Sequence, residues 1–141
     1  MTFGFQFDHV GITTSAAHLD QTIAWYRDHL DFLVIQQFEV GESVFTFIGT
    51  DNTKIEIISA GAAANPAPAA ESLPASHDVE RLHHICLRVP DLDAAIAELD
   101  RRGVALFAGP MTVEKSGQRF AFIRDNIGTI IEITDAVPMA G

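Results

Sequence analysis

The sequence predicts an α+β fold in which two tandem βαβββ modules form a curved eight-stranded sheet around a metal cavity. Three observations support this prediction. The order of strand-like and helix-like patterns repeats once along the chain. "DHVGITT" aligns with "HHICLRV" 75 residues later, and "FTFIGTDNTKIEII" aligns with "FAFIRDNIGTIIEI". The alignment also gives each module a histidine on its first strand and a glutamate on its last.

The first module is expected at about residues 5–59. Residues 5–14 alternate apolar and polar side chains and predict a strand. A helix should follow Ser15 as its N-cap, with one apolar stripe of Leu19, Ile23, Tyr26 and Leu30. Turn residues then separate three further predicted strands, at 33–40, 43–49 and 54–59.

Residues 60–80 are rich in alanine and proline and predict a linker, with a short helical turn near 69–73. The second module should span about 81–135, beginning with a strand in "LHHICLRV". Asp91 is the expected N-cap of the following helix and Gly103 its C-cap. The remaining strands are predicted at 104–108, 118–125 and 129–135, and the whole chain, 1–141, should be one domain.

Composition limits the possible partners. The chain has 141 residues, of which 48% are hydrophobic, so it can form a substantial core. Its net charge of −10 argues against nucleic acid or an anionic membrane as the main partner. The single cysteine precludes an internal disulfide and fits a reducing compartment. We therefore expect a cytoplasmic protein, free of the membrane, that binds a small-molecule substrate.

Strand alternation predicts which residues share a face. The aligned histidines are His9 and His84, and the aligned glutamates are Glu56 and Glu132. Branched apolar residues occupy the opposite parity, where the helices should pack. Two histidines and two carboxylates suit a borderline divalent ion such as Zn, Ni, Co, Mn or Fe, and the ligand set does not choose among them. The alternative is a salt-bridge cluster of the same four residues without metal.

The second histidine of the "HH" doublet, His83, should lie on the helix-packed face as a structural residue. Cys86 and Arg88 share the parity of His84, and Arg119 is placed at the cavity as well. Arg88 could bind a substrate carboxylate or phosphate, or pair with an inward glutamate; Arg119 could instead be a solvated strand-end residue. Cys86 is interpreted as a small packing residue. Four phenylalanines at repeated positions are expected in the core: Phe45, Phe47, Phe120 and Phe122.

The phrases "FDHVGITT", "LHHICLRVPDLDAAIAELDRRGV" and "FAFIRDNIGTIIEI" resemble the vicinal oxygen chelate superfamily, the glyoxalase/bleomycin-resistance/extradiol-dioxygenase group. The resemblance covers nearly the whole chain except residues 60–80. In the branches of glyoxalase I and methylmalonyl-CoA epimerase, it implies metal ligands at the four positions named above. It also implies proton abstraction next to a carbonyl, with Glu132 or Glu56 as the base.

Two departures from the family pattern are visible. Thr46 stands where the epimerase has its second catalytic glutamate, which makes it a candidate substrate-binding residue. Thr13 stands where an arginine of glyoxalase I would bind the glutathione carboxylate. The sequence thus predicts a metal-dependent lyase or isomerase. A non-catalytic sequestering protein and an Fe(II) or Mn dioxygenase remain the alternatives. A homodimer is expected, with the site formed within one chain or across two.

Overall fold

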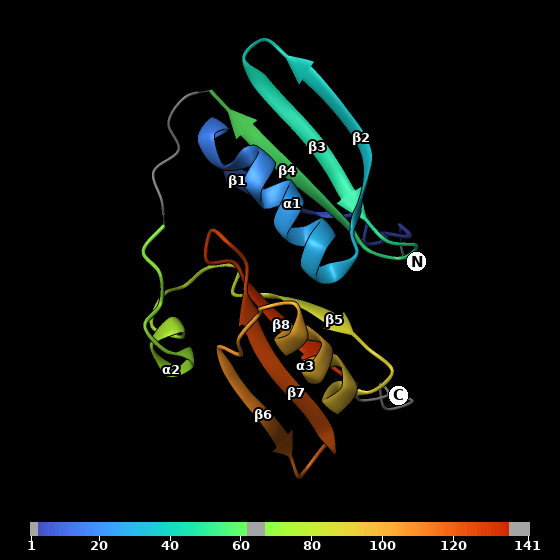
Figure 1. Cartoon of the computed structure of the whole chain (residues 1–141), viewed down its shortest axis with the longest axis vertical. Helices are drawn as coiled ribbons and strands as arrows, with labels where there is room; N and C mark the ends of the chain where they lie inside the picture. The colour runs from blue at the N-terminus through green and yellow to red at the C-terminus, as the bar shows by residue number, and fades with distance from the viewer. Residues whose placement is uncertain (1–2, 62–66, 136–141) are drawn as a thin grey trace. The chain divides into compact units, whose positions relative to one another are not determined.

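The fold consists of two α+β units with the same succession of elements, shown in a computed structural model that describes residues 3–61 and 67–135. The first unit covers residues 1–66 and the second covers 67–141. Each unit contains one four-stranded sheet and one long helix (Figure 1). The predicted fold class and the two tandem modules are confirmed. The eight strands hydrogen-bond as two separate four-stranded sheets rather than as one continuous sheet.

The sheet of the first unit has the strand order β1-β4-β3-β2. Strand β1 (Val10–Thr14) runs parallel to β4 (Lys54–Ala60), and antiparallel pairing joins β4 to β3 (Ser43–Gly49) and β3 to β2 (Leu33–Val40). A 3-10 turn, η1 (Ala16–His18), follows β1 and leads into helix α1 (Leu19–Leu30). The parallel pairing requires a crossover, and this helix provides it.

The second unit repeats this plan with the order β5-β8-β7-β6. Strand β5 (Ile85–Arg88) is parallel to β8 (Ile130–Thr134), which pairs with β7 (Gln118–Arg124), and β7 pairs with β6 (Ala108–Val113). Helix α3 (Leu92–Arg101) is the crossover between β5 and β6. A short helix, α2 (Leu73–Ser76), precedes β5 within the predicted linker.

One face of each sheet is buried with its helix, as alternation in the strands predicts. In the first unit Ile55 and Ile57 of β4 are 0% exposed, as is Tyr26 of α1, which crosses the sheet (Figure 1). In the second unit Ile131 of β8 and Leu92 of α3 are also completely buried. Burial of one large aliphatic side chain contributes about 2 kcal/mol, so these two clusters are major sources of stability.

The first strand is shorter than predicted. Residues 5–9 lie outside β1, and the side chains of Phe3, Phe5 and Phe7 are 90%, 94% and 86% exposed. The pairing of β1 begins with Val10 opposite Ile55, and β4 itself begins only one residue earlier. The described residues before His9 therefore extend beyond the start of β4.

The prediction of a strand at 104–108 was wrong for all but its last residue. Val104 instead caps α3, because its amide donates to the Leu99 carbonyl at 2.8 Å. Strand β6 begins at Ala108 and includes a cis peptide bond before Pro110. Proline is tolerated there because β6 is an edge strand, and the pairing with β7 is irregular between Ala108 and Met111.

The predicted N-cap of the second-module helix is confirmed, whereas its C-cap is Arg102, one residue before the predicted Gly103. The Asp91 side chain accepts from the Ala94 amide at 3.1 Å, and Gly103 follows the last turn with φ +84°. The turn expected near 69–73 lies slightly later, in α2, where Ser72 accepts from the Ala75 amide at 3.2 Å. Among the described residues, no helix combines the length and apolar character that crossing a membrane requires.

Candidate metal-binding site

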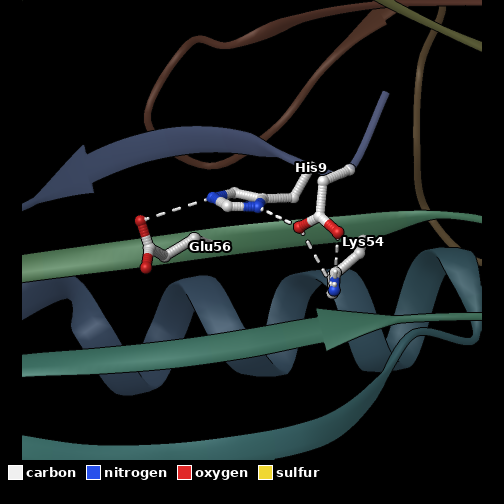
Figure 2. A network of polar contacts seen from close by, with 4 residues as sticks. His9, Lys54 and Glu56 are labelled. Atoms are coloured by element: carbon white, nitrogen blue, oxygen red, sulfur yellow. Dashed lines mark hydrogen bonds and ion pairs between the residues drawn. The ribbon is translucent and has the colours of Figure 1, made fainter. Parts of the chain in front are cut away.

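His9 and Glu56 face each other on the open face of the first sheet. Glu56 is the register partner of Gly11 on β1, and a Cβ at Gly11 would lie 3.9 Å from Glu56 Oε1. His9 precedes β1 by one residue, and its Nε2 lies 3.8 Å from the same oxygen (Figure 2). Both side chains are partly exposed, 33% for His9 and 18% for Glu56. The face predicted from strand alternation thus contains both residues.

The other nitrogen of the His9 ring is held by Asp8. Asp8 Oδ2 lies 2.6 Å from His9 Nδ1, and Lys54 Nζ lies 3.3 Å from Asp8 Oδ2 (Figure 2). The hydrogen bond from His9 and the contact with Lys54 lower the pKa of Asp8, so this carboxylate is ionised at neutral pH. His9 is consequently fixed at one nitrogen and faces Glu56 with the other.

His84 and Glu132 form the equivalent pair in the second unit. His84 Nε2 lies 2.9 Å from Glu132 Oε2, and the Gln118 side chain donates to Glu132 Oε1 at 3.4 Å. Cys86 is the register partner of Glu132. Burial raises the pKa of the Cys86 thiol to about 12, and the charge of Glu132 acts in the same direction. The thiol is therefore neutral near pH 7, which disfavours a role as a nucleophile, but Cys86 is exposed and does not fit the small packing residue that the sequence predicted.

His83 contacts His84 directly. The two Nδ1 atoms are 2.7 Å apart, and His83 Nε2 lies 2.7 Å from the Ser76 hydroxyl of α2. Burial lowers the pKa of His83, and the neighbouring His84 and His77 rings lower it further. The sequence predicted a structural role for His83 beside the helix of its sheet; its contacts instead join His84 to α2.

The donor atoms of the two pairs suit a divalent metal ion. In each pair the imidazole Nε2 faces a carboxylate oxygen of the glutamate. The Nδ1 of the same ring contacts a different side chain. Such outer hydrogen bonds are typical of metal-ligating histidines. In the described ranges, 3–61 and 67–135, no three His, Cys, Asp or Glu side chains are grouped in a way that could hold a metal ion. The candidate ligands are therefore found as two His–Glu pairs, one in each module.

The three residues that the sequence assigned to substrate binding do not all lie on the faces that carry the His–Glu pairs. Arg88 is exposed on β5 and has the parity of Cys86, which places it on the Glu132 face. Arg119 lies on the helix-covered face, and its Nη2 is 3.2 Å from Asp93 Oδ2 and 3.3 Å from Asp135 Oδ2. On β7, Arg119 and Ala121 point to the same face of the sheet, and Glu132 lies on the other face.

Thr46 also lies away from the His9–Glu56 pair. It is 0% exposed and is the register partner of Ile57, on the face that α1 covers. Its hydroxyl accepts a hydrogen bond from Gln37 at 2.9 Å. Thr46 therefore stabilises the first sheet from its helix-covered side.

The four phenylalanines, which the sequence placed in the core, lie on the same faces as the His–Glu pairs; Phe122 is buried and the other three are half-buried. Phe47 is the register partner of Glu56, and its ring meets His9 edge-on at 5.3 Å. Phe122 is the partner of Glu132 and meets His84 at 5.6 Å. On β2, Phe38 is 40% exposed and stacks on Phe45 at 5.3 Å. Each pair thus lies beside an aromatic surface.

The sequence reasoning missed the residues that hold the histidines at Nδ1. Asp8 and His83 are each the residue before a predicted ligand, so the 75-residue repeat already aligned them. Their different side chains concealed the common position. Ser76 carried no signal, because α2 has no counterpart in the first module.

The chain resembles known proteins in sequence and in fold. The family model described as "Glyoxalase/Bleomycin resistance protein/Dioxygenase superfamily" matches residues 8–122. No curated protein shows significant sequence similarity to the chain. Among solved structures, a glyoxalase family protein from Enterococcus faecalis is 21% identical with a TM-score of 0.74, covering 95% of this chain and 100% of its own.

Two further structures illustrate the range of the fold. A glyoxalase I mutant from Zea mays is 14% identical with a TM-score of 0.66, covering 91% of this chain and 45% of its own. TnmS3, an antibiotic binding protein from Streptomyces sp. CB03234, is 17% identical with a TM-score of 0.64, covering 94% of this chain and 99% of its own. At these identities the similarity concerns the fold alone.

Proposed function

The chain belongs to the glyoxalase/bleomycin resistance protein/dioxygenase superfamily, and on this premise we propose that it is a divalent-metal-dependent lyase or isomerase. The proposed reaction removes a proton next to a carbonyl of a small oxygenated substrate, as in glyoxalase-like or epimerase-like chemistry. The observation that carries the proposal is the repeated His–Glu pair, in which Nε2 of the imidazole faces the carboxylate.

The proposed metal ligands are His9, Glu56, His84 and Glu132. Imidazole nitrogen and carboxylate oxygen are donors that Zn, Ni, Co, Mn and Fe(II) all accept. The equivalence of the two pairs supports a common role, since a salt bridge alone gives no reason for the same residue types in both modules. We also propose that the protein is a homodimer, which light scattering tests directly.

When bound, the metal ion supplies Lewis-acid polarisation of the substrate oxygens, which makes the adjacent C–H bond more acidic. The two carboxylates differ in how they are held. Glu132 contacts His84, Gln118 and Cys86, whereas Glu56 contacts His9 only at 3.8 Å. The less restrained Glu56 is therefore the better candidate to remove and return the proton, and Glu132 to remain fixed.

Arg88 is the proposed substrate-binding residue. It is exposed and shares the face of His84 and Glu132. Its planar guanidinium can bind a substrate carboxylate or phosphate through two parallel hydrogen bonds.

Proton exchange separates the role of the two carboxylates. Metal-loaded protein is incubated in D2O with a panel of α-hydroxy carbonyl compounds, and loss of the α-proton signal is followed by NMR. Glu56→Gln should abolish exchange while retaining most of the metal, and Glu132→Gln should lose the metal itself. Glu71→Gln, at a linker glutamate that belongs to neither pair, is the matched control. Full exchange by Glu56→Gln would contradict its role as the base.

A second candidate function is sequestration of an aromatic small molecule. The observation that favours it is the exposed Phe38–Phe45 stack, whose rings are tilted by only 15° and lie beside Phe47. Such a surface can bind a planar ligand by stacking. If this function is correct, Phe38→Ala weakens binding of aromatic compounds, and no member of the substrate panel undergoes exchange.

A further inference from the structure

We propose that Asp8 and the His83–Ser76 pair are positioning residues, which keep His9 and His84 protonated at Nδ1 and thereby direct each Nε2 toward its glutamate, as the ring nitrogen that a metal ion would bind. The inference rests on the proposed metal site and deepens it, because it names what orients the ligands. It also assigns a role to α2, which lies in the segment expected to be only a linker.

In the first unit the assignment follows from the chemistry of a carboxylate. Asp8 Oδ2 lies 2.6 Å from His9 Nδ1, and an ionised carboxylate can only accept a hydrogen bond. His9 must therefore donate through Nδ1–H. Lys54 contacts Asp8 at 3.3 Å and holds it in place. In the neutral ring the lone pair is then on Nε2, which faces Glu56 at 3.8 Å, beyond hydrogen-bond distance.

In the second unit the same conclusion follows from a chain of four groups. The Leu73 carbonyl can only accept, so the Ser76 hydroxyl donates its single proton to it. Ser76 Oγ must then accept from His83 Nε2–H, at 2.7 Å. A neutral His83 has its lone pair on Nδ1, which accepts from His84 Nδ1–H at 2.7 Å.

The orientation of His84 is thus determined by a backbone carbonyl two side chains away. Its Nε2 lies 2.9 Å from Glu132 Oε2, so in the metal-free protein a proton is shared between these two atoms, and a metal ion would replace that proton. The two modules therefore achieve one result by different means. Asp8 and His83 occupy equivalent places in the repeat, one as an anionic acceptor and the other as a neutral relay to α2.

Tautomers can be measured on the metal-free protein by long-range 1H–15N correlation spectra at about pH 8.5, well above the pKa of a free imidazole. In the unmodified protein His9 should show the Nδ1–H pattern, and His84 should carry a proton at Nδ1 besides the one that its Nε2 shares with Glu132. Asp8→Ala should give a mixture of tautomers at His9 and leave His84 unchanged. Ser76→Ala should do the reverse, although Ser76 touches neither proposed ligand. His83→Ala should match Ser76→Ala, and the serine variant suffices if the histidine variant does not fold.

Metal affinity supplies the second readout, with Zn²⁺ as the probe in calorimetric titrations. Loss of an outer hydrogen bond should weaken binding about 10- to 100-fold in Asp8→Ala and Ser76→Ala. Ser15→Ala is the matched control, since it removes another serine–histidine hydrogen bond, 3.1 Å long, outside the site. Its Zn²⁺ affinity should be unchanged.

The outcomes separate this inference from the proposed function. An Nε2–H pattern at His9, a His84 ring without a proton at Nδ1, or protonation patterns that neither variant alters would overturn the positioning role even if Zn²⁺ binds. Unchanged Zn²⁺ affinity in both variants would overturn it as well. Failure of the unmodified protein to bind any of the proposed divalent ions would instead overturn the metal-dependent function, and the role assigned here with it.

Discussion

Cys86 on β5 and Glu132 on β8 are direct partners in the parallel register of the second sheet. Burial, together with the charge of Glu132, raises the pKa of the Cys86 thiol to about 12, and Arg88 acts in the opposite direction. A raised thiol pKa means less thiolate at any given pH than in a free cysteine. The pair is therefore a measurable indicator of the charge on Glu132.

The metal-free protein should react slowly with thiol reagents at pH 8, because the thiol stays protonated well above the pKa of an ordinary cysteine. Glu132→Gln removes the neighbouring negative charge, so the thiol pKa should fall and alkylation by iodoacetamide should accelerate. Rates measured from pH 7 to 10 on both proteins test this. An equal rate in the two proteins across that range would show that Glu132 carries no charge beside Cys86.

Arg88 and Arg119 should respond oppositely to the same substitution. Arg119→Gln breaks the contacts with Asp93 and Asp135 on the helix-covered side. Loss of these ion pairs should lower the free energy of unfolding. The decrease should not exceed about 1 kcal/mol, because solvent screens the partly exposed arginine. Arg88→Gln should leave stability unchanged and weaken binding of an anionic ligand such as lactate to the metal-loaded protein.

Urea unfolding and lactate titration, performed on both arginine variants, give the comparison. Weakened lactate binding by Arg119→Gln with full stability would mean that Arg119 reaches the substrate. It would thereby support the role that the sequence suggested for it.

Thr46→Val should leave metal binding and turnover unchanged. The Thr46 side chain is buried on the helix-covered face of the sheet, away from the face that carries Glu56. It accepts one hydrogen bond, from the exposed Gln37. Valine fills the same volume, and Gln37 can bond to water instead, so the expected loss of stability is about 1 kcal/mol or less. Thermal unfolding and the proton-exchange assay measure the two effects. A selective loss of exchange would place Thr46 in contact with substrate.

Alternation within a strand was enough to predict that His9 and Glu56 share a face, and that His84 and Glu132 do. Alternation could not predict which face of each sheet the phenylalanines occupy, because that requires the register between strands. Phe47 lies opposite Glu56 and Phe122 opposite Glu132, so both occupy the open faces. Arg119 was misplaced for the same reason, since its parity on β7 is that of Ala121 and not of Phe122.

Two local features lay beyond the sequence pattern. The predicted strand ended at residue 108, before Pro110, whereas β6 continues through this proline, because an edge strand tolerates the missing N–H. The contact of Ser76 with His83 joins residues from a linker and a strand, and hydrophobic periodicity gives no information about such polar contacts.

The metal content of purified protein tests the central claim most directly. Protein loaded with each candidate ion, dialysed and analysed by inductively coupled plasma mass spectrometry should retain one divalent ion per chain. His9→Ala, His84→Ala and Glu132→Gln should each lose it, whereas His18→Ala, at an exposed histidine outside the pairs, should retain it. Retention of a full equivalent by all three ligand variants, or none in the unmodified protein, would contradict the account.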